Sequence, residues 1–337
     1  VDTSPLPTTI EFPVGLPAAK KGEGWLAKAG DKELRLSNPE KIYFPERGYT
    51  KGDILTYYFN ASPTMLPHLI ERPLTLKRMP NGIHGDFFYE KNAAAHTPKW
   101  IETLAVQAES KTINYLTVRD VADMLYIANL GAIEFHPLHA KGLDQARPTY
   151  AFFDLDPMGN AAWSDVRYVA SLVKVVLDQL GIECYPKTSG ATGMQIMVPL
   201  DGKHDYREVR LFVGAVSRMV HEAEPDATSM EWEVSKRGST IYLDVNMNRE
   251  GANIAGAYSV RPVPEATVST PFGWDELDAM DPKLYTIETI FDRIGEIEDP
   301  FLPVAEGPGQ SLVGPLEQLQ PVFESFKITG AARQIKR

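Results

Sequence analysis

The stretch that most constrains this chain is an apolar run that ends in two carboxylates. Residues 150–157 read Tyr-Ala-Phe-Phe-Asp-Leu-Asp-Pro, and a short apolar and aromatic run of this kind is typical of a buried strand. Side chains at i and i+2 of a strand point to the same face. Asp154 and Asp156 are therefore predicted to point together at the end of the strand, where Pro157 interrupts the hydrogen-bonding ladder.

Two carboxylates held side by side repel one another unless a positive charge lies between them. Oxygen ligands suit Mg²⁺ or Mn²⁺, so a divalent cation is one interpretation of the pair. A strand that runs into an Asp-rich turn is the other, because Asp also forms turns. From these residues alone, both interpretations stay open.

Length and composition exclude several classes of protein. A chain of 337 residues allows one large domain or two ordinary ones. No stretch approaches the roughly 18 uninterrupted apolar residues of a membrane-spanning helix, and the first five residues do not resemble a signal peptide. Cys184 is the only cysteine, which excludes an intramolecular disulfide and a zinc site built from cysteines. We therefore expect a reducing, cytoplasmic location without a membrane partner.

The formal net charge of −11 argues at first against a nucleic-acid partner, because proteins that bind phosphates are usually basic. The charge is unevenly distributed, since residues 271–337 hold 12 acidic and 6 basic residues and the first 270 carry only −5. A local basic groove is compatible with those first 270 residues. Net charge therefore does not exclude DNA.

Three regions are expected along the chain. Residues 1–34 are rich in proline, lysine and glycine and are interpreted as an extended N-terminal arm. Residues 35–300 have the dense apolar pattern of a folded domain. Residues 301–337, punctuated by proline and glycine, are interpreted as a C-terminal arm or tail.

Residues 145–265 are expected to form the catalytic core. They show the order strand, helix, strand, strand, helix, strand, which is that of a ferredoxin-like or RNA-recognition-like sheet with two helices on one face. Asp244 lies inside the last apolar strand, where an unpaired carboxylate would be costly, and antiparallel pairing would bring it beside Asp154 and Asp156. Three carboxylates on one sheet face suit two-metal phosphoryl transfer.

Other local signals are weaker. Thr50 is predicted to cap one helix and Ser164 another, and residues 73–92 are predicted to form a hairpin or two short strands around a Pro-Asn-Gly turn. Lys77 and Arg78, beside three aromatic residues, could hold a nucleic-acid strand by charge and stacking. Aromatic residues in a strand more often belong to the core.

A glycine-bearing turn between two strands is predicted around residues 187–194. It is not a Walker loop, because no Gly-Lys-Ser/Thr opens a helix. Ser189, Gly190 and Gly193 could offer a hydroxyl and backbone N–H groups to a phosphate. A tight hairpin that needs glycine for its geometry alone is equally compatible.

Several motifs, taken in chain order, resemble one family. They are Leu-Ser-Asn-Pro-Glu-Lys-Ile-Tyr-Phe-Pro, Tyr-Thr-Lys-Gly-Asp, Asn-Leu-Gly-Ala-Ile-Glu-Phe-His-Pro, Phe-Asp-Leu-Asp-Pro, Lys-Thr-Ser-Gly and Tyr-Leu-Asp-Val-Asn. From about Leu36 to about Leu277 the chain resembles the polymerase domain of bacterial ligase D-type repair enzymes, within the archaeo-eukaryotic primase superfamily. The resemblance implies an α+β fold in which the βαββαβ catalytic sheet joins a second, N-terminal α/β subdomain.

The resemblance also assigns roles to particular residues. It implies that the catalytic ligands of two Mn²⁺ or Mg²⁺ ions are Asp154, Asp156 and Asp244. The residues implied to hold the incoming nucleoside triphosphate are His136, Ser189, Gly190, Gln195 and Arg261. Those implied to bind a DNA 5′-phosphate are Asn38, Lys41 and Lys51, although the two lysines by themselves read as ordinary surface lysines. The pair implied to stack on template bases is Phe88 and Tyr89.

Members of this family fill short gaps during double-strand-break repair by non-homologous end joining, tend to prefer ribonucleotides and favour Mn²⁺. The resemblance therefore implies a template-dependent nucleotidyltransferase that acts, close to the nucleoid, on gapped or broken DNA with a 5′-phosphate, with Ku and a DNA ligase as partners. No Lys-x-Asp-Gly ligase motif occurs in the chain. A stand-alone polymerase and a domain of a larger protein both stay open.

One residue departs from the family pattern. The family's Ser-Gly-x-x-Gly-Leu motif is commonly followed by His, whereas this chain has Gln195. A neutral amide can form a hydrogen bond with a phosphate, but it cannot carry charge or a proton to it. We expect weaker catalysis or a changed nucleotide preference, and therefore faster incorporation by a Gln195→His variant than by the parent.

Two rival functions use the same residues. An enzyme that makes a small nucleotide product would share the sheet and the metals, but it would have no need of a second phosphate site at Asn38, Lys41 and Lys51. A catalytically weak or inactive module that binds DNA ends is the other rival. The complete set of three aspartates argues against such a module, and Gln195 argues for it.

Overall fold

The computed structural model describes residues 16, 18–21, 24–108 and 111–325. The chain divides into two compact units. Unit 1 comprises Val1–Leu143, Asn253–Thr270 and Lys283–Asp299. Unit 2 comprises Asp144–Ala252, Pro271–Pro282 and Pro300–Arg337. In the described part of the chain, no helix is both long enough and apolar enough to cross a membrane.

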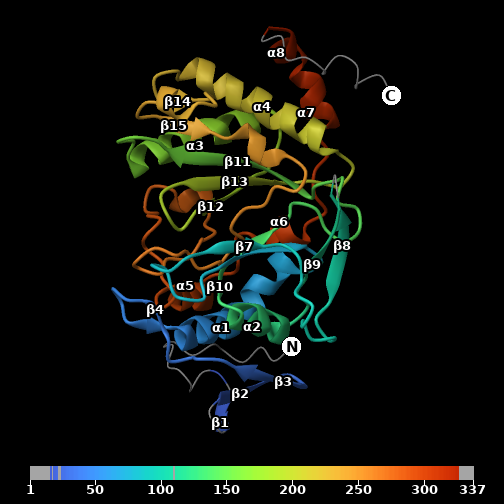
Figure 1. Cartoon of the computed structure of the whole chain (residues 1–337). Coiled ribbons are helices and arrows are strands. Elements are labelled where there is room, and N and C mark those ends of the chain that lie inside the picture. The colour runs from blue at the N-terminus through green and yellow to red at the C-terminus, as the bar shows by residue number, and fades with distance from the viewer. Residues whose placement is uncertain (1–15, 17, 22–23, 109–110, 326–337) are drawn as a thin grey trace. The chain divides into compact units, whose positions relative to one another are not determined.

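Unit 2 is built on a sheet with the strand order β12-β13-β11-β15-β14 (Figure 1). Its strands are β11 (Tyr150–Pro157), β12 (Tyr185–Thr188), β13 (Met194–Pro199), β14 (Thr228–Ser229) and β15 (Ile241–Leu243). The central strand, β11, pairs antiparallel with β13 on one side and with β15 on the other. Without the short parallel edge strand β14, this is the strand order of the predicted ferredoxin-like sheet, which is thereby confirmed.

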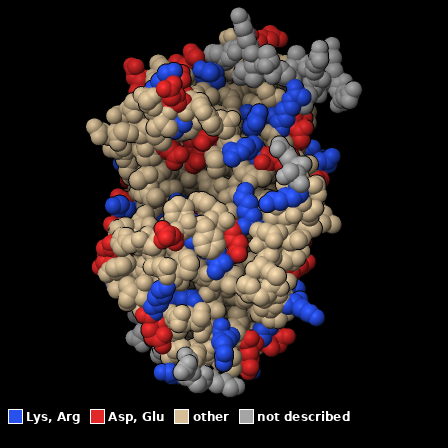
Figure 2. Space-filling model, in the orientation of Figure 1, with Lys and Arg blue, Asp and Glu red and all other residues tan. Residues whose placement is uncertain are grey.

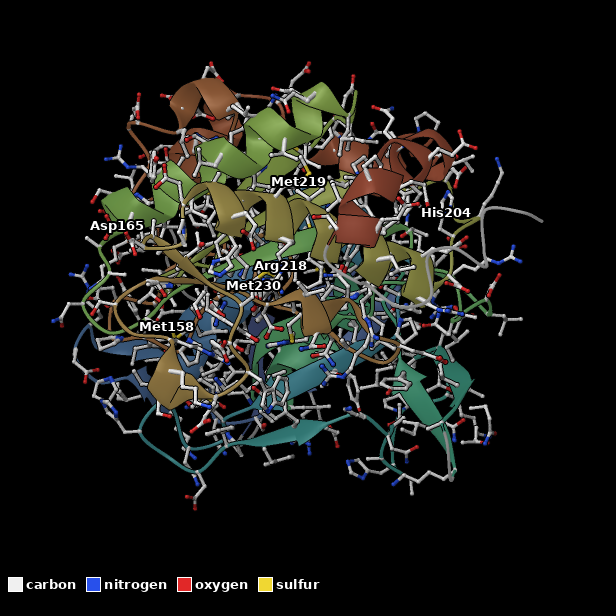
Figure 3. All side chains as sticks on the ribbon, turned by 90° about the horizontal axis from the view of Figure 1, so that it is seen from above. Met158, Asp165, His204, Arg218, Met219 and Met230 are labelled. Atoms are coloured by element: carbon white, nitrogen blue, oxygen red, sulfur yellow. The ribbon has the colours of Figure 1, made fainter. Side chains whose placement is uncertain are left out.

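Helices α3 (Trp163–Gln179) and α4 (Tyr206–Ala223) pack against each other and against this sheet (Figure 1). Both bury an apolar face with helical spacing, such as Val166, Val169 and Val173 of α3. The predicted cap at Ser164 was wrong. The N-cap of α3 is Ala162, two residues earlier, and the carboxylate of Asp165 (Figure 3) accepts a hydrogen bond from the N–H of Ala162 at 2.7 Å.

Beyond the end of β15, a side chain continues the hydrogen bonding of β11. The 3-10 turn η2 (Val245–Asn248) follows β15, and the amide of Asn248 bonds the backbone of Phe152 twice. Its Oδ1 accepts from the Phe152 N–H at 3.0 Å, and its Nδ2 donates to the Phe152 C=O at 2.8 Å. The buried amide thereby replaces a strand where β15 has ended, so that β11 stays fixed close to its two carboxylates.

The C-terminal part of unit 2, expected as an arm or a tail, contains three short helices among its described residues. Helices α6 (Leu302–Glu306), α7 (Val313–Gln318) and α8 (Gln320–Ser325) follow one another, and the turn η3 (Trp274–Glu276) precedes them in the chain. The N–H of Leu312 donates to Nε2 of the buried His204 at 2.9 Å (Figure 3). Residues 326–337 lie outside the described residues.

Unit 1 contains a second sheet, with the order β10-β6-β9-β8 and with β7 paired to β6. Its strands are β6 (Leu74–Arg78), β7 (Phe88–Glu90), β8 (Thr103–Gln107), β9 (Thr112–Leu116) and β10 (Ala132–Pro137). The pairing of β6 with β7 confirms the hairpin predicted within residues 73–92. Its helices are α1 (Lys51–Leu69), α2 (Val121–Asn129) and α5 (Ile290–Glu296).

Helix α1 begins where Thr50 was predicted to cap it. The Thr50 side chain accepts from the Asp53 N–H, and Asp53 in turn accepts from the Thr50 N–H, which forms a capping box. Tyr58 on the same helix stacks on Phe135 of β10 at 4.5 Å between ring centroids. Its hydroxyl donates to the C=O of Ile133. These contacts fix β10 on the helix.

A small sheet occupies part of the region expected as an extended arm. It consists of β1 (Ala18–Lys21), β2 (Gly24–Ala29) and β3 (Lys32–Leu36), in that spatial order, so the interpretation as an arm was wrong for these residues. Residues 1–15 lie outside the described part of the chain. A two-stranded ladder of β4 (Ile42–Phe44) and β5 (Tyr49–Thr50) leads into α1. The domain boundaries derived from the sequence stay a prediction.

Candidate active site

Three aspartates lie around the end of β11. Asp154 and Asp156 are two residues apart on this strand and share a face. Asp244 was predicted inside a strand, but β15 ends at Leu243, and Oδ1 of Asp244 accepts from the N–H of Asn246 at 3.0 Å to start η2. The Asp244 N–H donates to the Asp154 C=O at 3.2 Å, so strand pairing brings the three aspartates together.

The electrostatics of this cluster are those of like charges in a poorly solvated place. Burial, followed by the carboxylate of Asp156, raises the pKa of Asp154 well above the usual range of a carboxyl group. A hydrogen bond from Gln195 opposes this rise, and the charge of Asp244 adds to it. A bound cation would remove the repulsion.

The donor set fits a hard divalent cation, because it offers carboxylate oxygens from β11 and from the residue that follows β15. As the side chains stand, no three His, Cys, Asp or Glu side chains of the described residues already have a metal-binding arrangement. The assignment of Asp154, Asp156 and Asp244 to a metal therefore belongs to the proposal below.

The turn between β12 and β13 uses its own polar groups. Oγ of Ser189 accepts from the N–H of Ala191 at 3.1 Å and from the N–H of Gly193 at 3.0 Å. Gly190 has a φ of +70°, which favours glycine. These two N–H groups are occupied within the turn, which favours the hairpin interpretation for them. The predicted contact of Ser189 and Gly190 with a nucleotide stays a prediction.

Gly193 is required for a different reason. A Cβ atom at this position would lie 2.5 Å from the Leu155 carbonyl oxygen and 3.2 Å from Oδ1 of Asp156. Only glycine allows β13 to approach the end of β11 so closely. The residue therefore shapes the carboxylate cluster without contributing a side chain.

Gln195 lies directly opposite Asp154 in the sheet, and Lys187 lies directly opposite Gln195 on its other side. Lys187 Nζ donates to Gln195 Oε1 at 2.8 Å, and Gln195 Nε2 donates to Asp154 Oδ1 at 2.9 Å. All three side chains are buried. Sequence reasoning missed this role of Lys187, because lysine is rarely buried and only the strand register reveals its neighbour.

Unit 1 holds a cluster in which one buried carboxylate collects basic groups. Oε2 of Glu134 contacts Nε2 of His136 at 2.6 Å, and Oε1 accepts from Nε of Arg261 at 3.0 Å and lies 3.6 Å from Nζ of Lys77. Burial opposes ionisation, but His136, Arg261 and Lys77 together lower the pKa of Glu134 to about 2. The structure thus brings the predicted residues His136 and Arg261 together. Sequence reasoning missed Glu134, which holds them.

A second cluster of unit 1 has an excess of positive charge. Nζ of Lys51 donates to the carbonyl oxygen and Oγ of Ser37 at 2.7 and 2.9 Å. Nζ of Lys41 donates to Pro80 O at 2.6 Å. Burial, then the positive charges of Lys41 and Arg78, lower the pKa of Lys51 to about 8.

Asn38, the third residue predicted to bind a 5′-phosphate, lies three residues before Lys41. Asn38 has a φ of +48°, which Asn tolerates better than most residues, and its carbonyl oxygen accepts from the Lys41 N–H at 3.1 Å. Its side chain is exposed. Sequence reasoning missed Arg78 as a member of this cluster, although it had marked that residue as a possible nucleic-acid contact.

The predicted stacking residues are exposed on β7. Phe88 and Tyr89 have exposed fractions of 45% and 53%, and Phe87 before them has 54%. The guanidinium of Arg78 lies 5.0 Å from the ring centre of Phe88, and Nζ of Lys77 lies 5.0 Å from that of Phe87. These aromatic rings are therefore paired with basic groups rather than buried as core.

A groove with a volume of about 770 Å³ runs beside these rings, lined by residues 88–92 and 111–113. Figure 2 shows basic and acidic side chains interspersed on the visible face, without one continuous basic stripe. On this face, a nucleic acid would contact discrete clusters of basic and aromatic side chains.

The chain is similar to known proteins both in sequence and in structure. Residues 50–301 match the model of the family described as LigD, primase-polymerase domain. The chain is 29% identical over 275 residues to the multifunctional non-homologous end joining protein LigD of Mycolicibacterium smegmatis, covering 81% of this chain and 36% of that protein. It is 30% identical over 278 residues to the bifunctional LigD of Bacillus subtilis, covering 82% of this chain and 45% of that protein.

Among solved structures, the polymerase domain of Mycobacterium tuberculosis ligase D, determined in complex with DNA, superposes with a TM-score of 0.76 at 29% sequence identity. The match covers 81% of this chain and 98% of that domain. The chain thus spans less than half of the two LigD relatives, and its match covers almost the whole length of the solved polymerase domain. The chain belongs to the LigD primase-polymerase domain family, a family of DNA nucleotidyltransferases.

Proposed function

We propose that this chain is a template-dependent nucleotidyltransferase that extends ends and fills gaps in broken DNA by two-metal phosphoryl transfer, with a preference for ribonucleotides. The observation that carries the proposal is the convergence of Asp154, Asp156 and Asp244 at the end of β11 and β15, on the sheet of a primase-polymerase fold. A relative of this chain is named for non-homologous end joining, and a solved relative binds DNA.

Asp154, Asp156 and Asp244 would hold two Mn²⁺ or Mg²⁺ ions. When bound, such ions lower the pKa of the attacking 3′-hydroxyl and neutralise the leaving pyrophosphate. The chain's own part is to hold the three carboxylates in place. Pairing of β11 with β13 and β15 does this, and Gly193 leaves the room that the carboxylate of Asp156 occupies.

The incoming nucleoside triphosphate is assigned to two groups of residues. In unit 1, His136 and Arg261 offer N–H donors, and Glu134 orients both through its two oxygens. Because the pKa of Glu134 is about 2, this carboxylate stays charged at any pH at which the enzyme works. In unit 2, the triphosphate is assigned to Ser189, whose oxygen also accepts from two backbone N–H groups of its own turn.

The 5′-phosphate of a downstream DNA strand is assigned to Asn38, Lys41 and Lys51, joined by Arg78. This cluster has the positive charge and the backbone turn that a terminal phosphate requires. Phe88 and Tyr89 are assigned to stacking on template bases, which their exposure allows. A polymerase that recognises a phosphorylated end would work with Ku and a DNA ligase, in the bacterial cytoplasm at the nucleoid.

The test is primer extension on a gapped duplex that carries a downstream 5′-phosphate, with Mn²⁺ and either ribo- or deoxyribonucleotides. We expect extension by the wild type, none by Asp156→Ala, more product with ribonucleotides, and less product when the 5′-phosphate is removed. A wild type that binds the duplex but never extends the primer would contradict the proposal. That result would favour a module that only binds DNA ends, with Gln195 as the first residue to examine.

A further inference from the structure

Three side chains form a straight row across three strands of the catalytic sheet. Asp154 of β11, Gln195 of β13 and Lys187 of β12 occupy directly opposed positions in the two antiparallel ladders. Side chains in such positions lie on the same face. The two hydrogen bonds of the row, at 2.8 Å and 2.9 Å, run from Lys187 through Gln195 to Asp154.

The chemistry of the row requires a particular kind of residue in its middle. A lysine ammonium only donates and an ionised carboxylate only accepts, and two strand spacings, roughly 10 Å, separate their backbones. A bridging side chain must therefore accept at one end and donate at the other. The amide of Gln195 does so, and its orientation is fixed because Lys187 leaves the oxygen only one direction to face.

Burial makes the row costly to break. Lys187 has an exposed fraction of 0%, Gln195 of 3% and Asp154 of 7%. A buried ammonium needs compensating negative charge, and Asp154 lies close to the carboxylates of Asp156 and Asp244. The row therefore joins a buried cation to the carboxylate cluster through a neutral amide.

We propose that Lys187 and Gln195 are positioning residues of the metal site, which hold Oδ1 of Asp154 in one orientation and leave its second oxygen for a cation. This inference rests on the proposed function, because it assigns the two residues to the same metal-dependent site. It also explains why Gln can stand where the family commonly has His. A neutral imidazole has one acceptor and one N–H donor, as the amide has, so both residues can complete the row.

Binding of Mn²⁺ alone tests the proposal without turnover. The whole chain is titrated with Mn²⁺ at pH 7.5, and free Mn²⁺ is followed by its electron paramagnetic resonance signal. Gln195→Met keeps the length of the side chain but removes both hydrogen bonds, and we expect it to weaken Mn²⁺ binding about 10-fold to 100-fold, as loss of a residue that orients a metal ligand does. Gln195→His should restore binding to within about threefold of the parent.

Two further variants separate positioning from simple electrostatics. Gln195→Glu adds negative charge and Lys187→Met removes positive charge near the metal, so an effect of charge alone would tighten Mn²⁺ binding in both. The row predicts the opposite, because Glu offers Asp154 no donor and the loss of Lys187 frees the amide to turn. Tighter binding in either variant would overturn the proposal.

Two substitutions at exposed positions of unit 2 serve as controls. Gln179→Met and Lys203→Met change exposed residues of the same unit and should leave Mn²⁺ binding unchanged. Circular dichroism establishes that each variant is folded, and if Lys187→Met does not fold, the Gln195 variants decide. A wild type that binds no Mn²⁺ would overturn the proposed function itself. If the wild type and Gln195→Met bind Mn²⁺ equally tightly, only the positioning role of Lys187 and Gln195 is overturned.

Discussion

The aspartate cluster of unit 2 (Asp154, Asp156 and Asp244) and the lysine cluster of unit 1 (Lys41, Lys51 and Arg78) each hold like charges close together, negative in the first and positive in the second. Around Asp154, burial and two neighbouring carboxylates raise the pKa of an acid. Around Lys51, burial and two neighbouring basic groups lower the pKa of a base to about 8. Each cluster keeps like charges together at a cost in stability. Each is accordingly suited to a ligand of the opposite charge.

The cluster around Glu134 differs from both. Here a single buried carboxylate is surrounded by His136, Arg261 and Lys77, and its pKa falls to about 2. Acid and base compensate one another, so the cluster is stable in the absence of any ligand and can hold its N–H donors in advance. The aspartate and lysine clusters therefore need a ligand of the opposite charge to balance their own charges. The cluster around Glu134 balances its charges with groups of the protein itself.

The largest effect should come from removal of a carboxylate that has no substitute. Asp154→Ala is expected to lower primer extension about a thousandfold, because several kcal/mol of transition-state stabilisation by a bound cation would be lost. Single-turnover extension on a gapped duplex measures it. Affinity for the same duplex should change little, and a variant that retains more than about a tenth of the wild-type rate would contradict the metal assignment.

In the lysine cluster, Lys51→Met should abolish most of the preference for a 5′-phosphorylated duplex over an unphosphorylated one. A hydrogen bond to a charged group contributes about 1.5 to 3 kcal/mol, which corresponds to a loss of affinity of about 10-fold or more. Fluorescence anisotropy with both duplexes measures the ratio. Lys28→Met, at an exposed position of β2, is the matched control and should keep the preference.

The lowered pKa of Lys51 predicts a dependence on pH. Its ammonium is charged below about pH 8 and neutral above it, whereas the second pKa of a phosphate monoester lies near 6. Affinity for the 5′-phosphorylated duplex should therefore fall several-fold as the pH rises from 7 to 9. In Lys51→Arg, which stays charged throughout, the profile should be flat. A wild-type profile that is equally flat would mean that Lys51 does not bind the phosphate.

A smaller effect, on the free energy of unfolding, is expected at Gly193, where the absence of a Cβ lets the chain pass close to the end of β11. Gly193→Ala would place a Cβ 2.5 Å from the Leu155 carbonyl oxygen, and the forced shift should cost about 1 to 3 kcal/mol of unfolding free energy. Urea denaturation measures it. Gly214→Ala, in α4 with its nearest new contact at 3.5 Å, should be neutral or stabilising by up to about 1 kcal/mol.

Much of the catalytic sheet could be predicted from the sequence, because its signals are local. The strand within residues 150–157 was predicted from its apolar run, although the expectation that Pro157 interrupts the ladder was wrong, because Pro157 still belongs to β11 and pairs with Ile241. The helices after it were predicted from their helical spacing. The order of elements then gave the strand order. Asp244 was misplaced because its apolar neighbours continue the strand pattern, whereas its carboxylate accepts a backbone N–H and starts a turn.

Other features could not be predicted because they depend on pairings between distant residues. The burial of Lys187 and the role of Glu134 follow from strand register and from three-dimensional neighbours. The sheet of residues 18–36 did have a signal. In β3, Leu34 and Leu36 alternate with charged residues, but proline and glycine nearby outweighed this short pattern. The family motifs indicated which residues form the site, but they do not give the strand pairings and hydrogen bonds that hold those residues in place.

The central claim is that a bound cation balances the like charges of the aspartate cluster. The most direct test is a comparison of thermal unfolding with and without Mn²⁺, in the wild type and in Asp156→Asn. This variant removes a repelling charge and leaves the bond from Gln195 to Asp154 in place. In EDTA, we expect the variant to unfold about 2 °C above the wild type. In saturating Mn²⁺ the order should reverse, since only the wild type keeps its full set of ligands. A variant that is less stable than the wild type in both conditions would contradict the account.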